Sequence, residues 1–86
     1  MVHHLFDSFD IKEKAGGKYY EINFAYRTPF YVVRASTHHM WNIYENVEGF
    51  NPSKPMHSAR LKSCTSKEHA LSEAMVLVVE KFCEDL

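Results

Sequence analysis

The sequence predicts a small α+β domain in which an antiparallel sheet of three to four strands is packed on one face by a C-terminal amphipathic helix. Two patterns support this prediction. Apolar and polar residues alternate over residues 19–26, and apolar residues resume after a proline, which is typical of a β-hairpin. Near the C-terminus, apolar residues instead recur at three- and four-residue spacing, which is typical of a helix with one buried face.

The chain of 86 residues is long enough for one domain with a modest core. With 45% hydrophobic and 24% charged residues, its composition is that of a globular protein rather than a disordered one. We therefore expect a single domain over residues 1–86 in three parts. These are an N-terminal arm or short helix over 1–17, the antiparallel sheet over 18–63 and the helix over 65–86.

The predicted hairpin turns near Pro29, and symmetric pairing about that turn places Phe24 opposite Val33. One helix would then cover the sheet face that contains Ile22, Phe24 and Val33. The opposite face would stay open unless the arm folds back over it. The arm residues that could do so are Leu5, Phe6, Phe9 and Ile11.

Two further strands are predicted, over residues 40–44 and 57–63. The residues between them are rich in Gly, Pro and Asn, which indicates a long loop. Alternation within each strand selects the residues that face the core, which are Trp41, Ile43, Ala59 and Leu61.

The C-terminal helix is predicted to begin at a capping box, Thr65-Ser66-Lys67-Glu68. In this motif the Thr65 hydroxyl accepts a hydrogen bond from the amide of Glu68, and the Glu68 side chain reaches back to the amide of the cap residue. The apolar stripe that follows consists of Leu71, Ala74, Met75, Val78, Val79 and Phe82.

A sheet followed by a helix that opens on Thr65-Ser66-Lys67-Glu68 resembles the C-terminal part of double-stranded RNA-binding domains. The resemblance covers topology only. Such domains contact phosphates through a basic cluster at the start of this helix. The corresponding residues here, Ser66-Lys67-Glu68-His69-Ala70, hold one lysine followed by an acid, so the resemblance implies no activity for this chain.

The sequence carries no catalytic signature: it has no glycine-rich phosphate loop, no His-Glu-x-x-His and no nucleophile elbow. A chain of this length also seldom encloses the cleft of roughly 300–1,000 Å³ that small molecules occupy. We therefore expect that the protein is not an enzyme and that it uses no cofactor and no small-molecule substrate.

The six histidines do not form a metal-binding pattern. His3-His4 and His38-His39 are adjacent pairs, whose side chains point to opposite faces of an extended chain. His57, His69 and Cys64 could meet near the start of the helix, but no Cys-x-x-Cys accompanies them. We therefore expect no metal.

Two features favour a cytoplasmic location. The sequence lacks an apolar run of about 18 residues and a basic start followed by an apolar stretch, so we expect neither a membrane span nor a secretion signal. Cys64 and Cys83 would be separated by about 27 Å of helical rise. A disulfide requires Cα atoms within about 7 Å, and unpaired thiols suit a reducing compartment.

Charge is distributed unevenly along the chain, whose net charge is −1. Residues 49–67 contain four Lys or Arg and no acid, whereas residues 68–86 contain one Lys and five acids. A nucleic acid could use the basic segment because phosphate neutralisation supplies most non-specific affinity. Against this, the chain has a pI of 6.6, whereas nucleic-acid-binding domains are generally basic. Nucleic-acid binding through segment 54–67 is the alternative function, with candidate residues Lys54, Arg60, Lys62 and Lys67.

The principal expectation is a small non-catalytic binding protein that acts by protein–protein interaction, as an inhibitor, adaptor or regulatory protein of a larger complex. Its partner would be another protein or a second copy of itself. Aromatic residues and Met are enriched at the cores of interfaces, and the sheet face beyond the reach of one helix would present them. The candidate protein-binding residues are Tyr19, Phe30, Val32, Met40, Tyr44 and Phe50.

Overall fold

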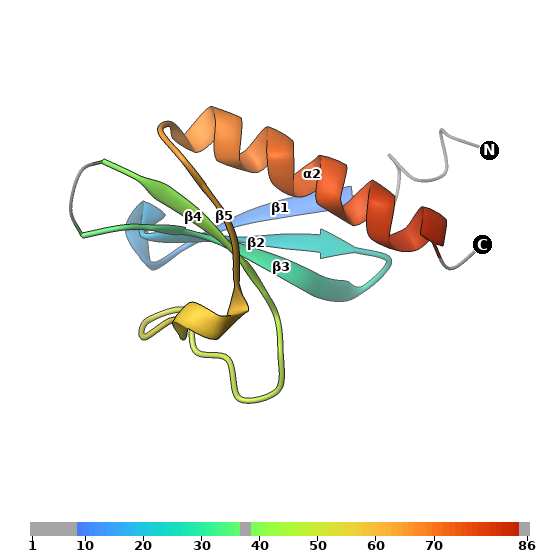
Figure 1. Ribbon diagram of the computed structural model, residues 1–86, viewed down its shortest axis with the longest axis horizontal. Coiled ribbons are helices and arrows are strands. Elements are labelled where there is room, and N and C mark those ends of the chain that lie inside the picture. Colours follow the sequence, from blue (N-terminus) through green and yellow to red (C-terminus); the bar gives the residue numbers. More distant parts are fainter. Residues whose placement is uncertain (1–8, 37–38, 85–86) are drawn as a thin grey trace.

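The computed structural model describes residues 9–36 and 39–84, with side chains in the helix described as far as Phe82. The chain forms a five-stranded antiparallel sheet in the order β1-β2-β3-β4-β5, with one long helix packed on one face (Figure 1). The α+β class is confirmed, whereas the sheet has five strands rather than three to four. The elements are β1 (Phe9–Lys14), β2 (Tyr19–Phe24), β3 (Arg27–Arg34), β4 (Trp41–Glu45), β5 (Arg60–Cys64), α2 (Lys67–Glu84) and the 3-10 turns η1 (Ala15–Gly17) and η2 (His57–Ala59).

The additional strand is β1, which lies in the segment expected to be an arm or a short helix. It pairs with β2 so that Ile11 lies opposite Ile22 and Phe9 opposite Phe24. The Phe9 and Phe24 rings meet edge to face at 5.4 Å, which places Phe9 in the core beneath the helix. Ile11 is exposed, so β1 has little alternation in burial. Its hydrogen bonding to β2 makes this segment a strand. Leu5 and Phe6 lie outside the described residues.

The β2–β3 hairpin turns at Ala25-Tyr26 and not at Pro29. Both turn residues have positive φ, 51° and 67°, as the two-residue turns that match the twist of a hairpin require. Ile22 consequently lies opposite Phe30. The register shifts between Ile22 and Phe24, across from Pro29, where the missing N–H of a proline costs no regular ladder hydrogen bond.

This register corrects the faces predicted for β3. The predicted pairing of Phe24 with Val33 is wrong, because Tyr19 lies opposite Val33 and Tyr20 opposite Val32. The observed pairing differs from the predicted pairing by an odd number of residues, so the side chains of β3 change face relative to the prediction. Phe30 and Val32 now lie beneath the helix, and Val33 lies on the other side.

The main core lies between the helix and the sheet, and α2 packs on β2, β3, β4 and β5. Trp41 and Ile43 belong to this core, as predicted. Each of its fully buried side chains stabilises the fold by about 1.5–3 kcal/mol relative to exposure. The largest of these side chains are Ile22, Val32, Ile43 and Val78.

The helix begins one residue later than the predicted capping box would place it. The Ser66 hydroxyl accepts a hydrogen bond from the amide of His69 at 3.1 Å, so Ser66 is the N-cap and not Thr65. The first helical residue is Lys67. Within the described residues, no helix is long and apolar enough to cross a membrane.

The second face of the sheet is largely covered by the chain itself. The connection between β4 and β5 lies below the sheet in Figure 1. Its residues Phe50 and Met56 pack against the cluster that contains Val33 and Tyr44. Of the last predicted strand, Ala59 is buried in this second cluster, but Leu61 is 47% exposed, so its predicted inward orientation is wrong. The second cluster comprises Val33, Tyr44 and Ala59, with Tyr19, Tyr31, Val47, Phe50 and Met56 around them.

Candidate anion-binding groove

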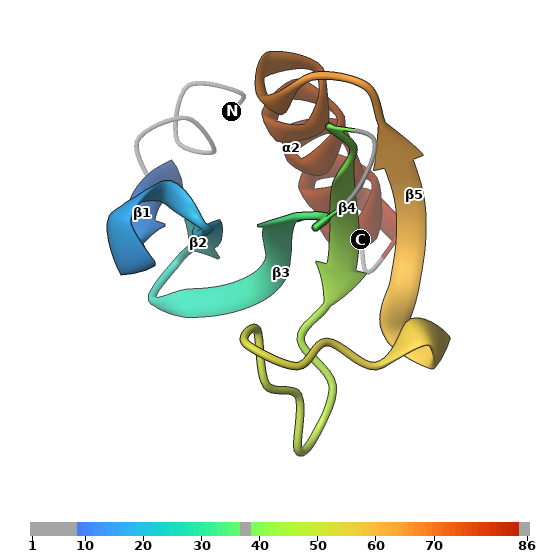
Figure 2. The same cartoon turned by 90° about the vertical axis from the view of Figure 1, so that its left-hand side faces the viewer.

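The second face of the sheet is open at one end, where a groove of about 1040 Å³ lies beside the covered part. The β1–β2 turn, the ends of β3 and β4, the start of β5 and loop residues 52–57 surround it. In Figure 2 the viewer looks at the end of the molecule where these segments come together. We call this hollow the basic groove. Its charged and histidine lining residues are Lys18, Arg34, His39, His57 and Arg60.

The basic groove is lined by side chains of one charge sign. Three Lys or Arg and two His residues line it, and no Asp or Glu is among its described lining residues. All five side chains are exposed to solvent. No described carboxylate lies within 4.0 Å of the Lys18, Arg34 or Arg60 cationic group. Cations around a concavity reinforce one another's potential, so the groove attracts anions.

The sheet register brings these cations together from distant parts of the chain. The amide of Arg34 donates a hydrogen bond to the carbonyl of Lys18 at 3.0 Å, so these two residues are neighbours at the end of the β2–β3 ladder. Arg60 lies opposite Tyr44 at the start of β5. His57 begins η2, the turn that leads into this strand, and it lines the groove together with Tyr44.

A short polar network lines the groove beside these cations. The Ser63 hydroxyl donates a hydrogen bond to Oδ1 of Asn42 at 2.6 Å. Nδ2 of Asn42 donates a longer one to the Tyr44 hydroxyl at 3.4 Å. Ser63 is exposed, Asn42 is half-buried and Tyr44 is buried. The network therefore offers hydroxyl and amide groups to a ligand at fixed positions.

Aromatic rings form the side of the groove nearest β2. Tyr19 lines the groove, and its ring meets that of Tyr31 edge to face at 6.0 Å. Tyr31 in turn stacks on Phe50 at 5.1 Å. Burial, with smaller contributions from Glu21 and Tyr19, raises the pKa of the Tyr31 hydroxyl above its usual value, so this ring stays neutral. Tyr19 is thus supported from behind by packed rings.

The six candidate protein-binding residues do not share one open face. Phe30 and Val32 lie under the helix, with exposures of 3% and 0%, and this part of the prediction is wrong. Tyr44 is also buried, and Phe50 packs against it. Tyr19, Met40 and Tyr44 do line the groove, together with its cations and histidines and with further apolar residues such as Val33, Pro52 and Pro55.

The four candidate nucleic-acid-binding residues are divided between the two faces. Arg60 lines the groove, and Lys54 is exposed in the loop between two lining residues. Lys62 instead pairs with Glu73 of the helix at 3.1 Å, and Lys67 lies 5.5 Å from the ring centre of Tyr20, a residue of the helix-side core.

Two cations of the groove, Lys18 and Arg34, were missed from the sequence. They are sixteen positions apart and flank the hairpin. A turn placed at Ala25-Tyr26 pairs them directly, whereas the turn expected at Pro29 separates them. The missing information was therefore the position of the turn.

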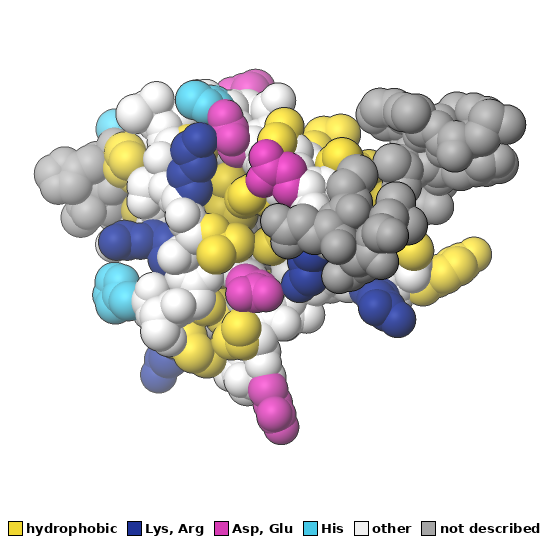
Figure 3. Space-filling model, turned by 45° about the vertical axis from the view of Figure 1, so that its right-hand side comes forward, with side chains coloured by type: hydrophobic (Ala, Val, Ile, Leu, Met, Phe, Trp, Pro, Cys, Tyr) yellow, Lys and Arg dark blue, Asp and Glu magenta, His cyan; other side chains and the backbone are white. Residues whose placement is uncertain are grey.

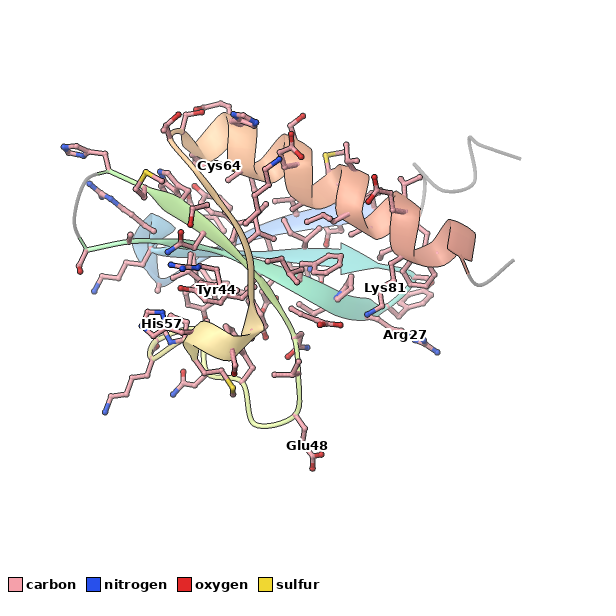
Figure 4. The ribbon with its side chains drawn as sticks, viewed as in Figure 1. Arg27, Tyr44, Glu48, His57, Cys64 and Lys81 are labelled. Carbon is pink, nitrogen blue, oxygen red and sulfur yellow. The ribbon has the colours of Figure 1, made fainter. Side chains whose placement is uncertain are left out.

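The described residues contain no group of three or more His, Cys, Asp or Glu side chains positioned to hold a metal ion. His57 begins η2, before β5, whereas Cys64 ends β5 (Figure 4), and His69 contacts Glu73 on the helix. Burial raises the pKa of the Cys64 thiol, which disfavours the reactive thiolate.

Comparison with known proteins adds no family to this description: no family model, no curated protein and no solved structure matches the chain significantly.

Proposed function

We propose that this chain is a non-catalytic binding module that holds a nucleic acid in the basic groove. The observation that carries the proposal is the lining of the groove, in which Lys18, Arg34 and Arg60 are unopposed by any described carboxylate. Phosphate groups are the anions that such a set of cations binds most effectively along a chain, because each contact releases a condensed counterion.

The net charge of −1 is compatible with this proposal because the charged lining residues of the groove itself are all Lys, Arg or His. Exposed acids of the helix, Glu68 and Glu80, lie on the other side of the sheet from the groove. In Figure 3, several dark-blue and cyan side chains lie along the left side of the molecule, and others lie at the lower right and beside the acidic side chains near the top. Local potential governs encounter with an anion more than net charge does.

The protein-interaction hypothesis has lost the surface on which it depended. It required an open apolar face containing Phe30, Val32 and Tyr44, and all three side chains are buried within their own chain. The basic groove is a different surface, whose charged lining residues are all Lys, Arg or His. A protein partner or a second copy remains a possible outcome of the experiment below.

The proposal is tested by measuring the binding of fluorescent mixed-sequence oligonucleotides by anisotropy at low and high salt. Arg60→Gln removes a cation that lines the groove. Lys12→Gln is the matched control, because it removes the same charge from β1, where Lys12 pairs with Asp10 at 3.9 Å. We expect Arg60→Gln to weaken binding clearly more than Lys12→Gln and to lower its salt dependence.

Two results would contradict the proposal. One is the absence of oligonucleotide binding by the unmodified chain at low salt. The other is an equal loss of affinity in both variants, which would indicate a diffuse charge effect without a site. Retention of a defined partner after nuclease treatment, without oligonucleotide binding, would favour the protein-interaction function instead.

A further inference from the structure

We infer that the basic groove takes a single-stranded nucleic acid rather than a duplex, an inference that rests on the proposed function. The distinction concerns the ligand's form: a duplex presents two phosphate backbones and stacked bases, whereas a single strand can place one backbone and exposed base faces in a hollow. Three independent features of the groove favour the single strand.

The first feature is the position of the cations relative to the fold. Proteins that read a duplex commonly insert a helix or a two-stranded ribbon into its major groove. Here the cations line a concavity, and α2 lies on the far side of the sheet with Glu68 and Glu80 exposed. Phosphate repulsion disfavours entry of this helix into a nucleic-acid groove.

The second feature is an aromatic ring beside the cations. Tyr19 lines the groove half-buried, and Tyr31 and Phe50 pack behind it in a continuous row of rings. A ring held in this way can stack on an unpaired base without ordering a mobile side chain first. The bases of an intact duplex already stack on one another and do not present a free face to Tyr19.

The third feature is the size and polarity of the groove. At about 1040 Å³ it slightly exceeds the range of roughly 300–1,000 Å³ that is typical of small-molecule sites, so it has room for a segment of linked units. The exposed Ser63 hydroxyl and the Asn42 amide lie within the same lining. They supply hydrogen-bonding groups that can meet base edges exposed in a single strand.

The experiment compares one mixed-sequence oligonucleotide of about 12 nucleotides, chosen to lack self-complementarity, with the duplex made by annealing its complement. DNA and RNA versions are both measured. We expect the single strand to bind at least tenfold more tightly. If the three lining cations each contact a phosphate, the logarithm of its association constant should fall with that of salt concentration with a slope of about −2.

A pair of variants tests the stacking contact. Tyr19→Leu removes the ring and should weaken single-strand binding by about 5- to 150-fold, while duplex binding changes little. Tyr19→Phe is the matched control, because it keeps the ring and should keep most of the affinity. Thermal unfolding of both variants verifies that they are folded.

The outcomes separate this inference from the proposed function. Equal or tighter binding of the duplex, or single-strand affinity unchanged in a folded Tyr19→Leu variant, would overturn the inference and leave nucleic-acid binding standing. Failure of the unmodified chain to bind either form would overturn both. The comparison of the two ligands uses the unmodified chain, so it decides the question even if Tyr19→Leu does not fold.

Discussion

The ammonium group of Lys62 lies 3.1 Å from the carboxylate of Glu73, so an ion pair joins the edge strand β5 to the helix. Arg60, only two positions earlier, lines the basic groove on the other side of the sheet. The β4–β5 register shifts between these two positions, which separates them onto different faces. One basic segment of the sequence therefore serves two purposes in the structure.

The first prediction contrasts these two cations. Lys62→Gln should lower the denaturation midpoint slightly, because it removes the partner of Glu73, and should leave oligonucleotide affinity close to that of the unmodified chain. Arg60→Gln should instead weaken oligonucleotide binding and leave the denaturation midpoint close to that of the unmodified chain. Anisotropy titrations and urea unfolding of both variants measure the two effects. Equal losses of affinity would mean that Lys62 also reaches the ligand.

The second prediction concerns acid stability. Hydrogen bonds from Lys62 and His69 hold the pKa of Glu73 below its ordinary value of 4.5. The folded state therefore favours the ionised carboxylate, so its stabilising contribution is present above pH 4.5 and is lost as pH falls through the lowered pKa. Urea midpoints measured on acidification should fall less in Glu73→Gln than in the unmodified chain. If the urea midpoints of both proteins fall equally as the pH is lowered, Glu73 does not contribute to the acid dependence of stability.

The third prediction concerns the hairpin turn. Ala25 and Tyr26 both have positive φ, a conformation that costs about 1–2 kcal/mol for a residue with a Cβ. Asn-Gly is the preferred pair in such a turn. Ala25→Asn combined with Tyr26→Gly should raise the free energy of unfolding by about 1 kcal/mol, since the fully exposed Tyr26 side chain loses no packing. Tyr26→Ala alone is the control and should gain little. A loss of stability in the double variant would place the turn elsewhere.

The fourth prediction tests the corrected face of β3. Phe30 is buried beneath the helix, so Phe30→Ala should cost about 3–5 kcal/mol of unfolding free energy. Leu61 is exposed on β5, so Leu61→Ala should cost under about 1 kcal/mol. Chemical denaturation of the two variants gives both values. Similar small costs at both positions would mean that Phe30 is on an open face after all.

The fifth prediction distinguishes the two candidate cap residues. The Ser66 hydroxyl accepts the His69 amide at 3.1 Å, so Ser66→Ala should lower the free energy of unfolding by about 0.5–2 kcal/mol. The exposed Thr65 lies before the cap, and Thr65→Ala should have a much smaller effect. Thermal unfolding measured by circular dichroism compares them. A larger effect at Thr65 would restore the capping box predicted from the sequence.

Alternation within a single strand was a reliable guide to its core-facing residues where that strand's own pattern was sufficient. The alternation of β2 correctly placed Ile22 and Phe24 in the core, and that of β4 correctly placed Ile43. The same reasoning misplaced Phe30 and Val32, because the face of β3 depends on the register of a hairpin as well as on its own alternation. Ala25-Tyr26 carries no glycine or asparagine, so its turn conformation left no sequence signal.

The candidate site depended still more on long-range pairing. Arg60 could be selected from the sequence because it belongs to a basic segment without acids. Lys18 and Arg34 could not, because neither lies in a basic run and their proximity arises from one inter-strand hydrogen bond. Lys62 and Lys67 belonged to the same segment as Arg60 but contact the helix and its core.

The sequence by itself determined the α+β class, the C-terminal helix and the placement of Ile22, Phe24 and Ile43 in the helix-side core, because each follows from a periodicity within a single element. Only the tertiary structure decided which face of β3 is buried, which loop covers the second face and which cations share a groove. The physical reason is that these features depend on strand register. Register is set by a turn and by pairing between distant residues, and a shift by an odd number of positions reverses every side chain of a strand.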